Sequence, residues 1–389
     1  MTEIRVLNDE AQFRAHTSVF RRAMHWGPPT DEQWEVVRPS YEPGRALAAF
    51  DGDEMIGTTM SFGSSILVPG GAVLPHAAIS RVGVRADYTR RGVLTALMRE
   101  QLSTMSDPIA TLRASEGRIY GRFGYGLAGR WRWVEIDAKR AAIVGEMTGR
   151  VRMVDHDTAD KLLPELHDAI GLARPGNISR WPGWWVRARD RKGDAGNSVT
   201  VVHSGPNGDD GFLTYKVSEE KDFKHKMSIE DFVWATPDAW RDLWMFVARL
   251  DLVDTIEIDL SLDDPVSLLF DDPRVIVTKD LQDEIWLRLV DVPHALQART
   301  YGVAEPVVIE VHDKLLPAND GCYRVSPDGV ERVEAPADLT IPVDLLGAVY
   351  LGDTTFSQLA AVKRIDGARF DEADALFAVA QKPFCGTFF

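Results

Sequence analysis

The chain has 389 residues, of which 45% are hydrophobic and 26% charged, and its net charge is −15 at neutral pH. This length exceeds one ordinary core and indicates two or three domains. The acidity disfavours nucleic acid and anionic membranes as partners and would concentrate cationic substrates, although ordinary acidic solubility explains it equally well. No run approaches the ~20 apolar residues of a membrane span, no secretory signal is recognisable, and the two cysteines cannot form a disulfide framework. We therefore expect a cytoplasmic protein.

The first 62 residues predict a strand, two helices and a hairpin. Residues 4–7 are expected to form the strand, and a helix capped by Asn8 should run to about Trp26. A second helix should begin at Thr30, where a capping residue again precedes carboxylates. Residues 45–50 and 55–62 alternate on either side of Asp51-Gly52-Asp53, which is a hairpin signal.

The next stretch combines a strand, a basic turn and a helix. Val82 and Val84 alternate as in a strand, and Thr89-Arg90-Arg91-Gly92 forms the turn. The following residues place one apolar face on a helix, with Leu94, Leu97, Met98, Leu102 and Met105 at three- and four-residue spacing. A strand that turns into a helix N-terminus presents unpaired N–H groups and the positive end of the helix dipole. The pattern therefore predicts a site for a pyrophosphate, with the arginines at its rim.

The pattern restarts around residues 140–155, after a strand at Arg130–Ile136. We expect a helix at Asp157–Ala169, a Pro/Gly/Trp-rich connection at Arg174–Trp185, and a helix capped by Thr236. Strands are expected between them at Val199–His203, Gly211–Val217 and Lys226–Trp234. The order repeats that of the first part without the Arg-Arg-Gly turn, so we predict a degenerate repeat that binds no cofactor.

From Ile285 the pattern changes again. A strand and short helix at residues 285–293 precede a strand at Val307–Val311 and a hairpin that pairs Gly321–Val325 with Glu331–Val333. Helices are expected at Ile341–Leu351 and Phe356–Val362. The chain then ends in residues 383–389, which are mostly apolar, whereas chain termini are usually polar and frayed.

Two stretches carry a resemblance to a known family. The strand, Arg90-Arg91-Gly92 and helix resemble the acetyl-coenzyme A loop of the GNAT superfamily, and residues 114–126, ASEGRIYGRFGYG, resemble the Eis (enhanced intracellular survival) family of aminoglycoside N-acetyltransferases. This resemblance implies an α+β fold with tandem mixed-sheet GNAT-type domains and a sterol carrier protein-like domain. We place these at 1–150, at 151–284, which is the degenerate one, and at 285–389. Family members form hexamers, so we expect a homo-hexamer.

The resemblance also implies that acetyl-CoA is the co-substrate. The strand would pair with the pantetheine amides, the turn and helix start would hold the pyrophosphate, and one serine after the next strand would add a contact. These cofactor-binding positions are Ser80, Arg81, Val82, Val84, Arg90, Arg91, Gly92, Leu94, Thr95 and Ser115.

Acetyl transfer to an amine needs a proton for the departing thiolate. Tyr120 stands at the position of the family's general acid, and a phenol of pKa about 10 is a sensible donor to a thiolate. Without the resemblance, the sequence would indicate that Tyr120 is a buried core residue. We interpret Tyr125 as such a structural residue. The second catalytic group implied by the resemblance is the terminal carboxylate of Phe389, which would orient Tyr120 or take an amine proton directly or through water. Its alternative is an inert docked tail.

For the acceptor amine, Phe20 and Trp34 match the family's substrate-binding aromatic residues, although a core role fits them equally well. Arg113 replaces a histidine that often contacts substrate, Phe388 replaces an acidic residue, and Thr89 replaces the first of three arginines. The first two changes make the acceptor site less anionic. The early carboxylates would either supply negative charge or form an exposed acidic face; they are Asp31, Glu32 and Glu35.

Two other sequence features do not indicate a binding site. Residues 124–129 fit G-x-G-x-x-G, but a strand follows rather than a helix, and Cys322 and Cys385 lack metal-ligand spacing, so no metal is expected. The sequence predicts an acetyl-CoA-dependent N-acetyltransferase of small cationic amines, aminoglycoside-like polyamines, with antibiotic resistance as the associated role. The alternatives are acetylation of protein lysines or N-termini, and a non-enzymatic lipid- or ligand-binding protein that uses its C-terminal domain.

Overall fold

The computed structural model describes residues 2–193 and 198–389. They form two compact units whose segments alternate along the chain. The first unit comprises Met1–Gly129, Arg174–Arg187 and Asp283–Phe389, and the second comprises Arg130–Ala173 and Ala188–Gln282. The domain boundaries inferred from the sequence remain predictions.

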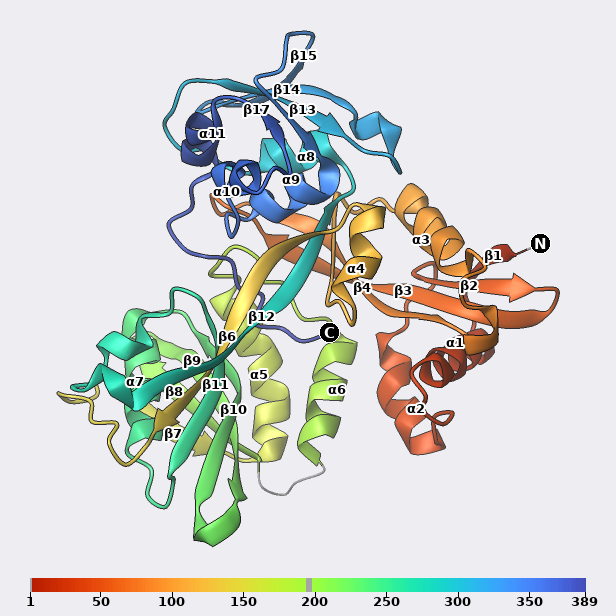
Figure 1. The fold of residues 1–389 in the computed structure, drawn as a ribbon. Coiled ribbons are helices and arrows are strands. Elements are labelled where there is room, and N and C mark those ends of the chain that lie inside the picture. The colour runs from red at the N-terminus through yellow and green to blue at the C-terminus, as the bar shows by residue number, and fades with distance from the viewer. Residues whose placement is uncertain (1, 194–197) are drawn as a thin grey trace. The chain divides into compact units, whose positions relative to one another are not determined.

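The first unit contains a mixed sheet with helices on both faces (Figure 1). Its strands follow the order β1-β2-β3-β4-β5-β12. All neighbours that are paired here run antiparallel except β4 and β5, which are parallel and joined by α3. The strands are β1 (Glu3–Leu7), β2 (Ala46–Asp51), β3 (Glu54–Leu67), β4 (Val73–Val84), β5 (Ile109–Leu112) and β12 (Ile276–Leu289). The helices are α1 (Glu10–Ala23), α2 (Asp31–Val37), α3 (Val93–Thr104) and α4 (Gly117–Tyr120).

The helix starts follow capping chemistry, with one correction. The cap of α1 is Asp9, not Asn8, because the Asp9 carboxylate accepts the N–H of Gln12, while Asn8 donates its own N–H to the Gln12 side chain. The helix also ends at Ala23 rather than near Trp26. The predicted cap at Thr30 is confirmed and forms a complete capping box.

The apolar face predicted for α3 is also confirmed. Val93 and Leu97 pack on β2 and β3, whereas Met98 and Leu102 pack on Ala77 and other residues of β4 and β5. Each of these α3 side chains is at most 2% exposed. Burial of side chains of this size contributes about 2 kcal/mol each, so α3 and the end of β4 are held firmly together.

The second unit repeats this connectivity. Its strands follow the order β6-β11-β10-β9-β8-β7, and the parallel pair β10 and β11 is joined by α7 as β4 and β5 are joined by α3. The predicted connection Arg174–Trp185 is partly wrong, because a helix begins at Pro182, a residue suited to a first helical turn. The strands are β6 (Gly126–Asp137), β7 (Arg150–Val154), β8 (Ser198–Gly205), β9 (Gly208–Glu219), β10 (His225–Trp234) and β11 (Thr255–Ser261). The helices are α5 (His156–Ile170), α7 (Pro237–Ala248) and the second half of α6 (Pro182–Gly193), whose residues up to Arg187 belong to the first unit.

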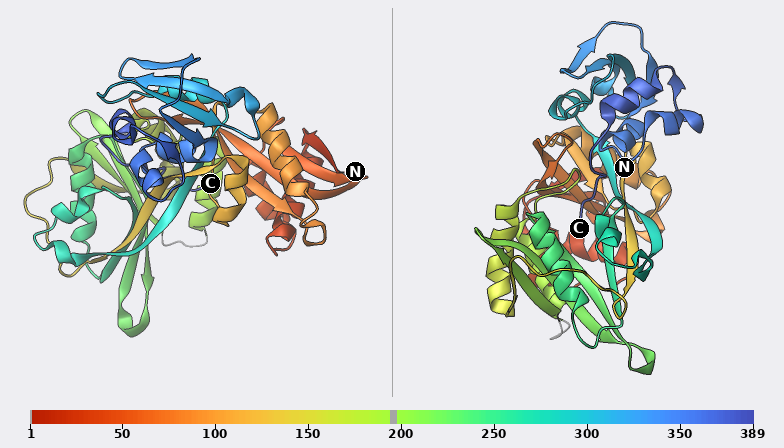
Figure 2. Two further views of the ribbon diagram at one scale, coloured as in Figure 1. Left: turned by 45° about the horizontal axis from the view of Figure 1, so that its top comes forward. Right: turned by 90° about the vertical axis from the view of Figure 1, so that its left-hand side faces the viewer.

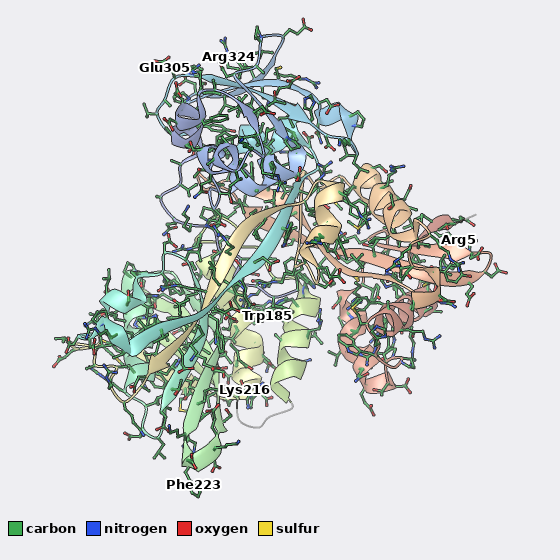
Figure 3. The ribbon with its side chains drawn as sticks, in the orientation of Figure 1. Arg5, Trp185, Lys216, Phe223, Glu305 and Arg324 are labelled. Carbon is green, nitrogen blue, oxygen red and sulfur yellow. The ribbon has the colours of Figure 1, made fainter. Side chains whose placement is uncertain are left out.

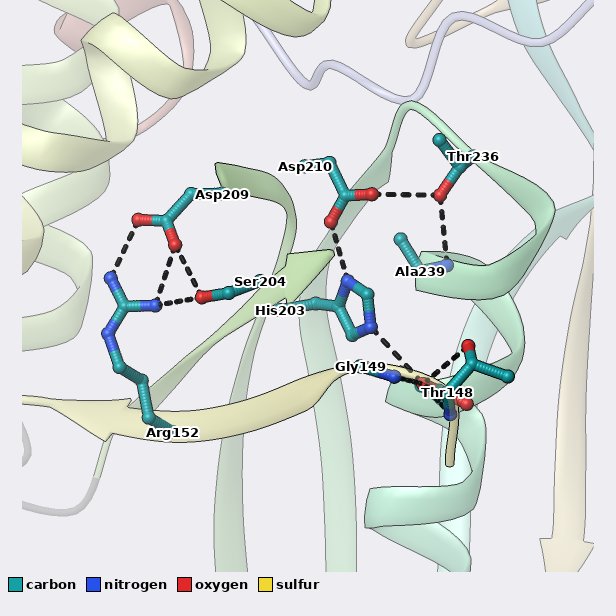
Figure 4. A network of polar contacts seen from close by, with 10 residues as sticks. Thr148, Gly149, Arg152, His203, Ser204, Asp209, Asp210, Thr236 and Ala239 are labelled. Atoms are coloured by element: carbon teal, nitrogen blue, oxygen red, sulfur yellow. Dashed lines mark hydrogen bonds and ion pairs between the residues drawn. The ribbon is translucent and has the colours of Figure 1, made fainter. Parts of the chain in front are cut away.

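A buried polar network fixes one end of this second sheet (Figure 4). His203 of β8 contacts Asp210 through Nδ1 at 2.5 Å and Asp242 through Nε2 at 3.2 Å. Asp242, on α7, also accepts the N–H groups of Thr148 and Gly149 at 2.8 and 2.7 Å. These partners tie α7 and the start of β7 to β8, which gives the His203 network a structural role. At the opposite end of the unit, Phe223 lies at the tip of the β9–β10 hairpin and is 86% exposed (Figure 3).

The C-terminal part of the first unit is a five-stranded sheet in the order β15-β14-β13-β16-β17. Helices α9 to α11 lie on one side of it (Figure 2). The predicted hairpin is confirmed with Cys322 opposite Val333, whereas the last helix was missed. The strands are β13 (Val307–His312), β14 (Gly321–Ser326), β15 (Gly329–Val333), β16 (Leu339–Pro342) and β17 (Asp366–Gly367). The helices are α8 (Val292–Ala298), α9 (Val343–Tyr350), α10 (Phe356–Ala361) and α11 (Phe370–Phe377). No helix in the described ranges is long and apolar enough to cross a membrane.

Candidate active site

The paired part of β4 and β5 ends before β4 does. Their register runs from His76 opposite Ile109 to Ile79 opposite Leu112, where β5 stops, and β4 continues to Val84. Beyond Ile79, the β5 side of β4 is therefore without a neighbouring strand in this register. The predicted pantetheine contacts at Ser80, Val82 and Val84 all fall on this segment.

A bulge in β4 marks the point where the strands part. The register against β3 shifts between Met60 and Thr58, and Arg81 adopts a left-handed backbone with φ +52°. Thr58 holds this conformation by donating its hydroxyl to the Arg81 carbonyl at 2.9 Å. The bulge directs the Arg81 side chain toward Tyr41 and Phe62 rather than along the pantetheine edge. Its predicted cofactor contact thus concerns its backbone alone.

The turn before α3 leaves the helix N-terminus without a side-chain cap. Gly92 is the N-cap residue with φ +84°, a conformation that other residues adopt only with strain, although a Cβ there would meet nothing within 4 Å. Arg90 is exposed with φ +63°, and Arg91 stacks over the ring of Tyr88 at 5.0 Å. The uncapped N–H groups and these cations make the predicted pyrophosphate site chemically sound. Leu94 and Thr95 lie half-buried in the first turn.

Tyr120 ends α4, which follows β5 and the exposed Ser115. Its ring is 6% exposed and packs in one apolar cluster with Ile79 and Met98. Its hydroxyl makes no hydrogen bond with any other described residue. Burial and the negative charge of Glu116 raise the pKa of Tyr120, so it stays protonated. A protonated phenol whose hydroxyl has no partner among the described residues fits a proton donor.

Tyr125, interpreted from the sequence as structural, is fully buried 6.1 Å from Tyr120 between ring centroids. Its hydroxyl is enclosed without a hydrogen-bond partner in the described chain, and burial strongly raises its pKa.

The C-terminal segment is held along its length by the connection that precedes α6. Arg174 donates to the Lys382 carbonyl at 2.9 Å, and Asn177 donates to the Phe384 carbonyl at 2.7 Å. Phe384 in turn donates its N–H to the carbonyl of Pro175 at 3.0 Å. These backbone contacts dock the tail independently of its side chains.

Glu284 of β12 is a second anchor of the tail, and no sequence pattern distinguishes it from the other carboxylates. Its carboxylate, 1% exposed, accepts the N–H of Cys385 at 2.8 Å and that of Gly386 at 2.9 Å. Arg113 donates to the same carboxylate and to the Thr387 carbonyl, both at 3.3 Å. Burial raises the pKa of Glu284, and Arg113 together with the two N–H groups opposes this shift.

The last two residues lie near the end of β5. Phe388 is 55% exposed with the Arg113 guanidinium 4.8 Å from its ring centroid, and its carbonyl accepts the Trp184 indole N–H at 2.8 Å. Phe389 is 7% exposed and meets Trp181 edge to face at 6.4 Å. Arg113, predicted to bind substrate, thus contacts the tail, which lies within the same unit as Tyr120.

The predicted acceptor residues fall in different environments. Phe20 is half-buried, and a Cβ on Gly83 would lie 3.4 Å from its ring. Trp34 is 2% exposed, and its ring centroid lies 6.0 Å from that of Tyr41, so it belongs to the core. The early carboxylates are exposed: Asp31 pairs with Arg14, Glu35 pairs with Arg38 at 2.9 Å, and Glu32 accepts the hydroxyl of Thr30 at 3.1 Å.

Family models match most of the chain. Models described as an acetyltransferase (GNAT) domain match residues 3–128 and 176–289, and a sterol carrier protein domain matches residues 292–386. Within the described residues, no cluster of side chains suited to a metal ion occurs. The fold and the β4–α3 site thus define an N-acetyltransferase of the GNAT class, and GNAT enzymes use acetyl-CoA as donor.

Relatives narrow this class. The chain is 32% identical over 388 residues, 92% of each chain, to an uncharacterized N-acetyltransferase of Streptomyces griseus. It is 31% identical over 377 residues, 90% of each chain, to the N-acetyltransferase Eis of Mycobacterium tuberculosis. The crystal structure of Eis1 from Mycobacterium abscessus covers the whole of both chains with a TM-score of 0.92 and 36% identity. The chain belongs to the Eis family.

Proposed function

We propose that the enzyme transfers acetyl groups from acetyl-CoA to amines of small molecules, aminoglycoside-like polyamines among them, and that it modifies more than one amine of such an acceptor. Three features that adjoin the C-terminal ends of β4 and β5, in the chain or by contact with Arg113, support the proposal. They are the uncapped N-terminus of α3, the hydroxyl of Tyr120, which has no partner in the described part of the chain, and the docked C-terminal segment. Cytoplasmic location and hexameric assembly remain predictions from the sequence.

The residues present fit the donor. The pyrophosphate would accept hydrogen bonds from the first-turn N–H groups of α3, with Arg90 and Arg91 beside it. The β4 edge from Ser80 to Val84 would pair with the pantetheine amides as an added strand does. When bound, acetyl-CoA supplies an activated acyl group, and the chain supplies orientation and protons.

In the proposed reaction the neutral amine nitrogen forms a bond to the acetyl carbon, and the carbon–sulfur bond breaks. Tyr120 donates its proton to the departing sulfur, which leaves as the thiol. The carboxylate of Phe389 accepts the proton that the amine loses, directly or through water, and a proton returns to Tyr120. The products are the N-acetylated amine and coenzyme A, and no other reactant is consumed.

Two other functions predicted from the sequence receive less support. A lipid-binding protein would not need its C-terminal segment held in place by Glu284 and Asn177. Acetylation of protein lysines would share the chemistry proposed here, so the acceptor panel has to decide between them.

Mass spectrometry of an amine panel after incubation with the protein and acetyl-CoA tests the proposal. The panel contains aminoglycosides, linear polyamines, amino acids and a lysine-containing peptide. Mass gains of one or more acetyl groups on small amines are expected. Acetylation of the peptide alone would move the acceptor to proteins, and failure of acetyl-CoA to bind in calorimetry would remove the β4–α3 site from the mechanism.

A variant with glycine added after Phe389 tests the carboxylate in the same assay. We expect turnover to fall by about 100-fold, within the range for general acid–base groups, while acetyl-CoA affinity stays unchanged. Full turnover by this variant would reduce the tail to a structural element.

A further inference from the structure

Arg81, at the bulge of β4, is a buried cation. It is 7% exposed, and no salt bridge to a side chain or to the terminal carboxylate reaches it within the described chain. Its Nη1 is enclosed without a hydrogen-bond partner among those residues. Nε and Nη2 make no hydrogen bond there either, and unlike Nη1 they are not fully enclosed.

The neighbours of Arg81 are aromatic or neutral. Its guanidinium carbon lies 4.6 Å from the ring centroid of Tyr41 and 5.8 Å from that of Phe62. The Tyr41 hydroxyl is already engaged with His16 and Thr17, each at 2.8 Å. Burial, and after it the charge of Arg81, lowers the pKa of His16 to about 3, so this histidine remains neutral.

The same group of side chains leads to the chain end. Phe62 stacks on Trp181 at 4.3 Å, and Trp181 contacts Phe389. Arg81 is thus separated from the last residue by two rings. It also belongs to the β4 segment whose backbone faces the proposed pantetheine site.

A buried guanidinium without a partner is unfavourable, because burial removes its hydration and cation–π contacts return only part of that free energy. Its partner is therefore expected to come from a ligand. Arginine presents its donors as a planar fork that matches a carboxylate in a bidentate pair. The carboxylates of the early helices that could favour a polycation are exposed and engaged in ion pairs, as in Asp31 with Arg14 and Glu35 with Arg38.

We infer that the preferred acceptors are amines that also carry a carboxylate, and that Arg81 binds this carboxylate through Nε and Nη2. The inference rests on the proposed acetyl transfer and specifies its acceptor class. Amines without an acidic group would leave Arg81 unpaired and react more slowly.

Three acceptors of equal length test the inference: 5-aminopentanoate, 5-amino-1-pentanol and 1,5-diaminopentane. The readout is kcat/KM with saturating acetyl-CoA, for the wild type and for Arg81→Gln, Arg81→Lys and Arg99→Gln. The last variant removes one exposed positive charge from α3 and serves as the control for net charge. We expect the acid to exceed the alcohol by at least tenfold in the wild type and in Arg99→Gln, and by less than threefold in Arg81→Gln, with Arg81→Lys between them.

A calorimetric measurement keeps the test decisive if turnover is low. The acetylated product 5-acetamidopentanoate should bind the wild type at least tenfold more tightly than its alcohol analogue, and this preference should vanish in Arg81→Gln. Equal binding of the two products, or a diamine rate at or above that of the acid, would overturn the inference. Acetylation of aminoglycosides without any preference for the acid would also overturn it and leave the proposed function standing.

Discussion

The two hydrogen bonds that Glu284 accepts from the C-terminal segment allow a quantitative prediction. Each carboxylate oxygen accepts one hydrogen bond: Oε2 from the N–H of Cys385 and Oε1 from the N–H of Gly386. Hydrogen bonds to an ionised group contribute about 1.5–3 kcal/mol each, so two give about 3–6 kcal/mol before the cost of burying the carboxylate. A net loss of about 3 kcal/mol in Glu284→Ala raises the undocked fraction of the tail about 100-fold.

Carboxypeptidase digestion reports this fraction, because the protease removes Phe389 only from an undocked tail. When docking is fast relative to cleavage, the initial rate is proportional to the undocked population. We expect a rate increase of about 100-fold in Glu284→Ala. Glu284→Gln should also release the tail, since one of its two acceptors becomes a donor.

The matched control is Asp283→Asn, which removes an exposed carboxylate one residue away and keeps an acceptor for the Trp286 indole. Its digestion rate should equal that of the wild type. Thermal unfolding of all variants separates release of the tail from global instability. An unchanged digestion rate in a folded Glu284→Ala protein would show that the carboxylate does not hold the tail.

Three further predictions concern chemistry, acidity and the cofactor turn. Tyr120→Phe should lower kcat by about 10²–10⁴-fold, whereas Tyr125→Phe, which removes an enclosed hydroxyl, should leave kcat near the wild-type value; equal losses in both would refute the assignment. Burial lowers the pKa of both His16 and His76 to about 3. Below about pH 6.5 the unfolded chain therefore binds more protons than the folded chain, and stability decreases as the pH is lowered. The free energy of unfolding in urea should be about 3 kcal/mol lower at pH 5.5 than at pH 7.5 for the two groups together, and a flat profile would contradict their burial as neutral rings. Gly92→Ala forces a side chain into φ +84°, costs about 1–2 kcal/mol, and should weaken acetyl-CoA binding about tenfold in calorimetry, while unchanged affinity would show that the turn does not hold the pyrophosphate.

Local signals in the sequence were sufficient where a short segment determines its own structure. The capping box at Thr30, the apolar face of α3 and the turn before Gly92 all appear as predicted, because each depends on residues within one or two turns of helix. The resemblance then supplied Tyr120 and the unusual chain end. Their catalytic roles remain predictions.

The anchors of the tail could not be predicted in this way. Asn177 and Trp184 read as parts of an irregular connection, and Glu284 as one more carboxylate in an acidic chain. Each becomes significant only because the fold places it beside residues that are between 101 and 208 positions away. Periodicity carries no information about such pairs. The same holds for Arg81. The sequence cannot show that the fold places no carboxylate of the described residues beside it.

The contrast between α3 and α7 supports the prediction that the first repeat binds acetyl-CoA and the second does not. Each helix follows the strand that begins its parallel pair, β4 or β10. At α3 the cap is Gly92, so the N–H groups of the first turn remain available to a phosphate. At α7 the hydroxyl of Thr236 accepts the N–H of Ala239 and donates to Asp210, and Asp238 adds a negative charge in the first turn. A pyrophosphate would have to displace this cap and approach two carboxylates, so we expect one molecule of acetyl-CoA to bind per chain.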